Sequence, residues 1–236
     1  MKKAFTPVFI ALISLLIVTC SPIDSKNSTE LNSTFKELND GISDDLEKFE
    51  ISIRYFSNNN FIGRPIPGYY ANKAFLTREA ADALLLAQRD FIKQGYRLKI
   101  YDAYRPQTAV DYFSAWAADL EDSQNKSQYY PNINKSQLFA DGYIAAKSGH
   151  SRGSAVDLTL LEIESGNELD MGSPWDFFDP ISWVENNQIT DQQRANRKLL
   201  ASVMIIHGFK PLKEEWWHFS YIEEPFPETY FDFPID

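Results

Sequence analysis

Apolar side chains recur with two different periods along the chain, and the changes of period predict where strands give way to helices. Residues 49–56 (FEISIRYF) alternate between apolar and polar positions, as expected for a half-buried strand. The next segment has helical spacing, with Thr77 placed as its N-cap and Gly95 placed to end it. The inward positions of this predicted helix are Ala81, Leu84, Leu85, Gln88, Phe91 and Ile92.

A second strand and a second helix follow directly. Residues 96–104 have strand composition, and the Arg105-Pro106 pair interrupts them. Proline suits the first position of a helix, because its fixed φ is already helical and an N–H there would have no partner in the helix. We therefore expect a helix from Pro106 to Ala118, followed by a polar connection over residues 121–136.

The C-terminal third repeats the same succession. Residues 154–163 (SAVDLTLLEI) are rich in β-branched and apolar side chains and predict a largely buried strand. Thr190 and Gln193 form a plausible capping box for a helix that ends at Gly208. Residues 215–222 predict the last strand, before a proline-rich aromatic tail. The inward positions of the predicted helix are Ala195, Leu199, Val203 and Ile206.

These elements mix strands and helices without a regular βαβ alternation. The pattern favours an α+β domain, with helices packed on a mainly antiparallel central sheet. Aromatic residues make up 14% of the chain, and many of them are expected in the core. Trp216 and Trp217 are interpreted as packing residues and not as a carbohydrate-binding surface.

The N-terminal residues have the composition of an export signal. Lys2 and Lys3 precede an apolar run over residues 8–18, and Cys20, the single cysteine of the chain, follows it. This order is similar to a bacterial lipobox, in which the cysteine carries the lipid. We expect a lipoprotein signal over residues 1–20, with Cys20 lipidated and the protein exported to the periplasm or cell envelope. Because Thr19 is unusual before such a cysteine, an ordinary secretory signal is the alternative.

Composition sets the remaining boundaries. Residues 21–45 are polar and are predicted to be a flexible tether, which leaves residues 46–236 as one catalytic domain. The formal net charge of −10 argues against nucleic acid and anionic lipid surfaces as partners, so we expect membrane contact only through the N-terminal lipid anchor. The sequence does not indicate an oligomeric state.

The candidate chemistry lies in two short segments. The chain has three histidines, and His150 and His218 each lie close in sequence to a carboxylate. A catalytic zinc site needs a few nitrogen and oxygen ligands and a free carboxylate that handles protons, and His150, Asp157 and His218 can supply the ligands of one zinc ion. Asp157 falls on the predicted buried strand, where a carboxylate needs a charged partner or a metal. His207 is left out, because the end of a helix accounts for it.

Glu215 is the candidate for the proton-handling group, but its spacing raises a difficulty. Glu215 and His218 are three residues apart, and in a regular strand they would point to opposite faces. If both serve one metal, Glu215 must lie in a loop or at a bulge. The alternative is a surface carboxylate beside Glu214.

Taken together, these segments resemble a known family. Residues 148–157 match the zinc signature SxHxxGxAxD of the D-alanyl-D-alanine metallopeptidases, a group that shares its fold with the hedgehog signalling domain. Within this group the chain resembles the VanX-type D-Ala-D-Ala dipeptidases, from about residue 50 to the C-terminus. The matching stretches are NFIGRP (60–65), YDAYRP (101–106), KSGHSRGS (147–154), MGS (171–173), DF (176–177), EWWH (215–218) and YFDFP (230–234).

The resemblance implies a role for each candidate residue. Glu215 would be the general base, and Arg105 would stabilise the oxyanion of the tetrahedral intermediate. Ser148 and Tyr69 would hold the substrate carboxylate, whereas Asp176 and Tyr55 would receive its ammonium group. An acidic group at that end would close the pocket and favour dipeptides.

The implied activity is the zinc-dependent hydrolysis of D-Ala-D-Ala to two D-alanines. Two alternatives remain: a D,D-carboxypeptidase that acts on longer peptidoglycan stems, and a zinc-bearing binding module without turnover. The presence of both Glu215 and Arg105 speaks against the binding module, because binding alone would require neither. An exported enzyme cannot reach a cytoplasmic dipeptide pool, so we favour turnover or salvage of wall-derived dipeptide over glycopeptide resistance.

Overall fold

The computed structural model describes Met1 and residues 33–236. The predicted signal over residues 1–20, the lipidation site Cys20 and the first part of the tether lie outside the described residues, apart from Met1. Within the described part, no helix is both long enough and apolar enough to cross a membrane.

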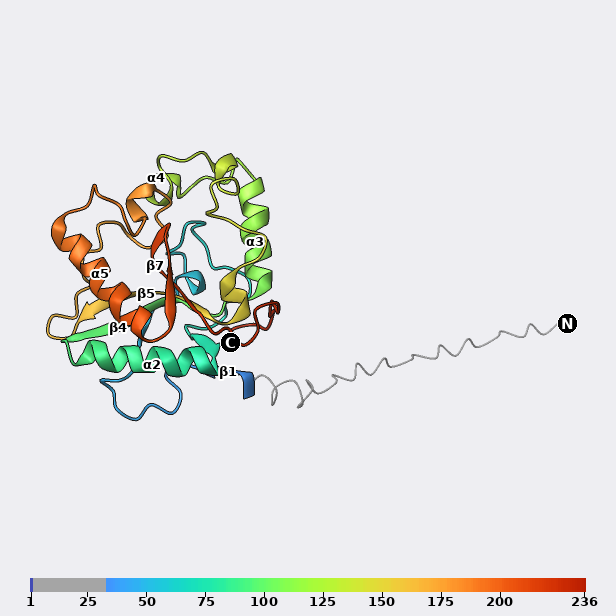
Figure 1. The fold of residues 1–236 in the computed structure, drawn as a ribbon. Coiled ribbons are helices and arrows are strands. Elements are labelled where there is room, and N and C mark those ends of the chain that lie inside the picture. Colours follow the sequence, from blue (N-terminus) through green and yellow to red (C-terminus); the bar gives the residue numbers. More distant parts are fainter. Residues whose placement is uncertain (2–32) are drawn as a thin grey trace.

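A five-stranded sheet forms the centre of the molecule (Figure 1). Its strand order is β2-β4-β5-β7-β6, and only the β2–β4 pair is parallel, so the predicted antiparallel sheet is confirmed. The strands are β2 (Glu50–Ile51), β4 (Tyr96–Asp102), β5 (Ala155–Glu162), β6 (Phe209–Leu212) and β7 (Glu215–Tyr221). A separate two-stranded sheet joins β1 (Phe35–Glu37) to β3 (Phe75–Thr77).

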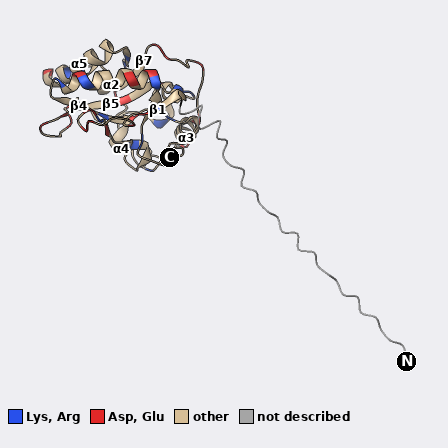
Figure 2. Cartoon of the chain, turned by 90° about the horizontal axis from the view of Figure 1, so that it is seen from below, with Lys and Arg blue, Asp and Glu red and all other residues tan. Residues whose placement is uncertain are grey.

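Helices cover the two faces of the central sheet unequally. The long helices α2 (Arg78–Ile92) and α5 (Asp191–Ile206) contact each other and lie on one side of β4 and β5, while α3 (Gln107–Ala118) and the short α4 (Lys126–Tyr129) lie on the other (Figure 2). Basic and acidic residues alternate with other residues along α2 and α5, which is usual for helices with one face in solvent (Figure 2). The domain therefore has the predicted α+β architecture.

The ends of the long helices follow the sequence signals closely. Thr190 and Gln193 form both hydrogen bonds of the predicted capping box at the start of α5. The predicted end of α2 is also confirmed, since Gly95 has φ 85° in the turn before β4. Thr77 does precede α2, but its hydroxyl lies 3.0 Å from Ser154 Oγ and caps no helical N–H. The hydrogen bond between Thr77 and Ser154 therefore connects the start of α2 to the start of β5.

The predicted buried face of α5 is only half right: Val203 is buried and Leu199 packs against the core, but the other two positions do not. Ala195 and Ile206 are exposed, and the accessible fraction of Ile206 is 75%. Polar residues replace them in the interior, because Asn196 and Arg197 bond to backbone carbonyls of the segment before the helix. The buried positions are Asn196, Arg197, Leu200, Val203 and Met204.

The predicted first strand is much shorter than expected. Of residues 49–56, only Glu50 and Ile51 pair with β4. A 3₁₀ helix over Arg54–Phe56 follows, and it turns the Tyr55 ring into the core, where 1% of the residue is accessible. The prediction was too long because the alternation of apolar and polar residues continues beyond Ile51, where the chain leaves the sheet.

The tether also ends earlier than predicted. Phe35 and Leu38 are buried, and β1 pairs with β3 in the folded domain. Phe35 packs edge-on against the rings of Tyr104, Phe231 and Phe233. The prediction failed because two apolar residues in a polar segment are enough to fix it to the domain when they pack against a cluster of aromatic rings.

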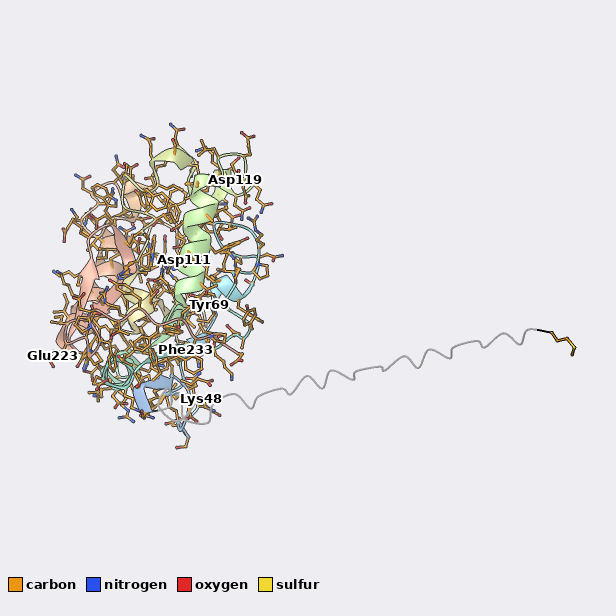
Figure 3. The ribbon with its side chains drawn as sticks, turned by 90° about the vertical axis from the view of Figure 1, so that its right-hand side faces the viewer. Lys48, Tyr69, Asp111, Asp119, Glu223 and Phe233 are labelled. Atoms are coloured by element: carbon orange, nitrogen blue, oxygen red, sulfur yellow. The ribbon has the colours of Figure 1, made fainter. Side chains whose placement is uncertain are left out.

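Trp216 and Trp217 confirm the packing interpretation, because both are buried in the hydrophobic core. The C-terminal tail, residues 223–236, packs against this core through Phe231, Phe233 and Ile235. Phe233 stacks on Tyr104 with ring centroids 4.0 Å apart, and Figure 3 shows Phe233 and Tyr69 near the N-terminal end of α3. Tail, α3 and the loop after β4 thus meet beside the site described next.

Candidate active site

His150 lies in a single turn of 3₁₀ helix, Gly149–Arg152, immediately before β5. Ser148 begins this turn, with its hydroxyl accepting a hydrogen bond from His150 N at 3.2 Å. Gly153 ends it in the left-handed region with φ 76°, a conformation that favours glycine. A Cβ at position 153 would also lie 2.4 Å from the Phe35 ring, so glycine is required there for two reasons.

Asp157 and His218 face each other across two central strands. They are direct partners in the antiparallel β5–β7 pair, which places their side chains on the same face of the sheet. His218 Nδ1 lies 3.0 Å from Asp157 Oδ1 and 3.0 Å from His150 Nε2. His150 Nε2 in turn lies 3.2 Å from Asp157 Oδ1. One atom from each of three residues therefore converges on a single point.

The donor set fits a divalent metal ion. The separations of 3.0 to 3.2 Å are close to the roughly 3.3 Å expected between ligand atoms in a tetrahedral site with bonds of about 2.0 Å. His150 Nδ1 lies 2.7 Å from the carbonyl oxygen of Ala103, to which it donates as an N–H. In a neutral ring this leaves Nε2 with a bare lone pair aimed at the cluster. His218 Nε2 lies 3.2 Å from Ser220 Oγ, so its Nδ1 is available in the same way.

The buried negative charge of Asp157 makes the cluster suitable for a cation. Asp157 is buried, which by itself raises its pKa, but the adjacent His150 and His218 outweigh burial and hold the pKa well below its usual range. Burial lowers the pKa of His218, and the hydrogen bond and charge of Asp157 overcome this and raise it. Asp157 and Glu215 thus place His218 in a negative environment that favours a positive charge.

Glu215 lies beside His218, although regular strand spacing would have placed the two side chains on opposite faces. It is the first residue of β7, where a register shift against β6 pairs it with Leu212, although Phe219 pairs with the neighbouring Pro211. This irregularity lets Glu215 point to the same side as His218, with Oε2 3.9 Å from His218 Nδ1. Burial raises the pKa of Glu215 to about 7, and Asp157 adds to the increase. The predicted bulge is confirmed.

Arg105 reaches the cluster from the break after β4. Its Nε and one terminal nitrogen both lie 2.9 Å from Asp102 Oδ2. The same terminal nitrogen is 3.9 Å from Asp157 Oδ2, and the guanidinium lies over the Tyr55 ring at 5.1 Å. Only 13% of the Arg105 side chain is accessible, so these contacts fix the direction of its charge.

Asp102 is a site residue that sequence reasoning missed. It is fully buried at the end of β4, and burial raises its pKa although Arg105 and His150 oppose the increase. Its Oδ1 accepts a hydrogen bond from the Tyr69 hydroxyl at 2.7 Å. An acid at the end of an apolar strand, three residues before an arginine, was the available signal.

Tyr69 does not occupy the place that the resemblance implied. Its ring is buried, its hydroxyl is bound to Asp102, and it does not line the cavity beside the metal ligands. A direct contact with the substrate carboxylate is therefore not supported by this geometry. The contact with Asp102 instead makes Tyr69 part of the support beneath Arg105.

Asp176 and Tyr55 form a pair at the other side of the site. The Tyr55 hydroxyl donates to Asp176 Oδ2 at 2.7 Å. Burial raises the pKa of Asp176 well above its ordinary value, and Asp157 adds to this. Among the described residues, Asp176 alone combines a side chain with a positive φ, 57°, and such strain is commonly found at functional sites. The preceding Trp175 was also missed, and its Nε1 donates to Asp157 Oδ2 at 3.3 Å.

A cavity of about 290 Å³ brings these groups together. Ser148, which the resemblance placed at the substrate carboxylate, lines it, and so do the three metal ligands. The other chemistry-bearing residues in its wall are Tyr55, Arg105, Asp176 and Glu215, and Phe61, Val110, Phe113 and Phe178 form apolar parts of the wall. The site can therefore hold a small ligand that carries charges of both signs.

Comparison with known proteins agrees with this site. The D-ala-D-ala dipeptidase family matches residues 40–236. A D-alanyl-D-alanine dipeptidase of Enterococcus faecium is 43% identical over 182 residues, which cover 77% of this chain and 90% of the relative. One from Streptomyces coelicolor is 44% identical with the same coverage, and one from Escherichia coli is 34% identical over 72% of this chain and 78% of its own length.

The match spans the loops and strands that supply the metal-binding cluster, Arg105, Asp176 and Glu215. At this level of identity over most of both chains, shared ancestry accounts for the fold and for the site together. The chain therefore belongs to the D-Ala-D-Ala dipeptidase family and is a metallopeptidase.

Proposed function

We propose that this protein is a zinc-dependent dipeptidase that hydrolyses D-Ala-D-Ala to two D-alanines. The observation that carries the proposal is the convergence of His150, Asp157 and His218 on one point, with Glu215 beside them in a small cavity. Two imidazoles and one carboxylate, with a further position left for water or substrate, are a donor set typical of catalytic zinc. Three relatives that cover most of this chain bear the name D-alanyl-D-alanine dipeptidase.

The protein residues divide the hydrolytic work between them. When bound, zinc would acidify water and polarise the carbonyl of the scissile bond. Glu215 would accept the proton of the attacking water and return it to the leaving amine nitrogen, for which a pKa of about 7 is well suited. Arg105, held by Asp102, would face the negative charge that develops on the carbonyl oxygen.

The two ends of the cavity suit the two ends of a dipeptide. The Asp176 carboxylate, fixed by Tyr55, would receive the free α-ammonium group. Ser148 Oγ accepts the N–H of His150, which leaves the hydroxyl proton available to the substrate carboxylate. Because Asp176 and the surrounding rings are buried, an acylated amine in place of the ammonium would lose this ion pair and lack room. This favours a dipeptide over a longer peptidoglycan stem.

The site of action follows from the N-terminal sequence. Lys2, Lys3, the apolar run over residues 8–18 and Cys20 support export and lipidation. We propose that the enzyme acts in the cell envelope on wall-derived dipeptide. Fractionation of wild type beside Cys20→Ala tests this: wild type should pellet with membranes, and the variant should not. Wild-type enzyme in the cytoplasm would contradict the proposal.

The activity is tested by amine release from zinc-loaded protein with three substrates. D-Ala-D-Ala should be cleaved, whereas L-Ala-L-Ala and a pentapeptide that ends in D-Ala-D-Ala should be poor substrates. Faster release from the pentapeptide would indicate a D,D-carboxypeptidase. Metal content, measured on the same samples, should be one zinc per chain, and His150→Ala should lose the zinc together with the activity.

A further inference from the structure

Three basic side chains line the cavity, and they differ in their ion pairing. Arg105 is bound to Asp102, and Arg152 is bound to Glu224 with a distance of 2.8 Å between its terminal nitrogen and Oε1. Lys147 has no carboxylate within ion-pair distance among residues 33–236. It therefore brings a positive charge to the cavity that the described protein residues leave uncompensated.

Lys147 is held in place by an aromatic ring. Lys147 is exposed, and its Nζ lies 4.4 Å from the ring centroid of Tyr230 in the C-terminal tail. A cation–π contact of this kind orients an ammonium group without neutralising it. The charge thus stays available to an anion while the side chain has a preferred direction.

The neighbouring residue points to the kind of anion. Lys147 directly precedes Ser148, and both line the cavity together with Gly149 and His150. The available proton of the Ser148 hydroxyl and the charge of Lys147 are therefore presented by consecutive residues. Two acidic groups of the cavity, Asp176 and Glu215, come from other segments. A zwitterionic ligand would find one cationic and one anionic region in a single small cavity.

We propose that Lys147 is a specificity-determining residue, which selects ligands with a free C-terminal carboxylate by pairing with that group. The inference rests on the proposed dipeptidase function and deepens it. Since the chain carries a formal charge of −10, a local cation is also what an anionic substrate end needs on its approach. Lys147 acts on binding, so its loss should change KM and leave the chemical step intact.

The test compares a free acid with the corresponding amide. Steady-state kinetics are measured for wild type, Lys147→Met and Lys147→Arg on D-Ala-D-Ala and on D-alanyl-D-alaninamide, which lacks the negative charge. Lys198→Met is the matched control, because Lys198 is exposed on α5 and does not line the cavity. Zinc content and the urea midpoint are recorded for each variant.

Lys147→Met should raise KM for D-Ala-D-Ala about tenfold, with kcat changed less than about twofold. Its kinetics with the amide should match those of wild type, and Lys147→Arg should stay within about threefold of wild type on the acid. An unchanged KM for the acid, or an equal rise for acid and amide, would overturn the role of Lys147. If wild type cleaves longer peptides and not the dipeptide, the dipeptidase proposal fails, while the acid–amide comparison on those peptides still tests Lys147.

Discussion

At the scale of single residues, the geometry sets Glu215, the proposed general base, apart from the three proposed metal ligands. Glu215 lies 3.9 Å from His218, whereas the ligand atoms lie within 3.2 Å of each other. Its distance and its raised pKa both suit a group that exchanges a proton and does not hold a cation.

Glu215→Gln should therefore retain stoichiometric zinc and lose about 10²- to 10⁴-fold in kcat, because an amide cannot accept the proton. Metal content by atomic emission and kcat on D-Ala-D-Ala measure the two effects. Glu214→Gln is the control, since its carboxylate does not line the cavity and bonds to Lys213. Loss of zinc in Glu215→Gln would show that this residue is a ligand.

Asp102 is the residue on which the direction of Arg105 depends. Asp102→Asn keeps the shape and a partner for the Tyr69 hydroxyl, but it removes the charge that both guanidinium contacts use. We expect kcat to fall by about tenfold or more with KM and zinc content little changed, because the proposed role of Arg105 is confined to the transition state. Addition of the same change to Arg105→Ala should cost little more if the two residues act together. Additive losses would contradict this coupling.

At the scale of elements, a buried arginine connects a helix to the loop that carries Asp176. Arg197 of α5 donates to the carbonyl oxygens of Met171, Ile181 and Trp183 at 2.6, 2.9 and 2.7 Å. Burial lowers its pKa to about 10, which still leaves it charged at neutral pH. Arg197 thus binds the loop on both sides of Asp176, at residue 171 and at residues 181 and 183.

Arg197→Met should destabilise the protein by about 3 kcal/mol, because one buried and two partly buried carbonyls lose their donor together. Urea unfolding gives the size of the loss. Lys198→Met, the adjacent exposed position, should change stability by less than about 0.5 kcal/mol. Arg197→Lys should retain part of the stability and raise KM for D-Ala-D-Ala, since a single ammonium cannot reach all three carbonyls. A wild-type KM in that variant would show that the loop is positioned by other contacts.

Helix α5 also shows which features could be predicted from the sequence and which could not. Thr190 and Gln193 predicted the start of α5 correctly, because a capping box is formed by residues close together in the chain. Leu199 and Val203 of the inward face were predicted correctly, but Ala195 and Ile206 were not, because apolar periodicity cannot show that Asn196 and Arg197 bind the carbonyls of a distant loop. The grouping of His150, Asp157 and His218 was predictable from a local signature and one strand. Asp102, Trp175 and the position of Tyr69 depended on contacts made only in the fold.

At the scale of the whole molecule, residues 35–39, which directly precede the family match, are part of the folded domain. The match begins at residue 40, yet Phe35 is 4% accessible and packs among three aromatic rings. Thr77 N also donates to Gly153 O, so the small β1–β3 sheet is bonded to the residue that ends the metal-ligand turn. The N-terminal strand thus supports the site from behind.

Phe35→Ala should destabilise the protein by about 3–5 kcal/mol, as for other large-to-small changes in a core. It should also weaken zinc binding, because the turn that carries His150 loses its backing. Thermal unfolding and competition with a zinc chelator measure these effects, and Lys36→Ala in the same strand is the control. Zinc affinity equal to that of wild type in Phe35→Ala would limit the strand to a purely stabilising role.

The contact between Phe35 and Gly153 also constrains how this protein can change over evolutionary time. The ring fills the volume that a side chain at position 153 would need, so the two positions are not free to vary independently. A lineage that acquires alanine at 153 must bear the strain of a side chain at φ 76° and must also, first or at once, lose the ring at 35. The two positions should covary among relatives, although one belongs to the metal-binding signature and the other lies before the family match.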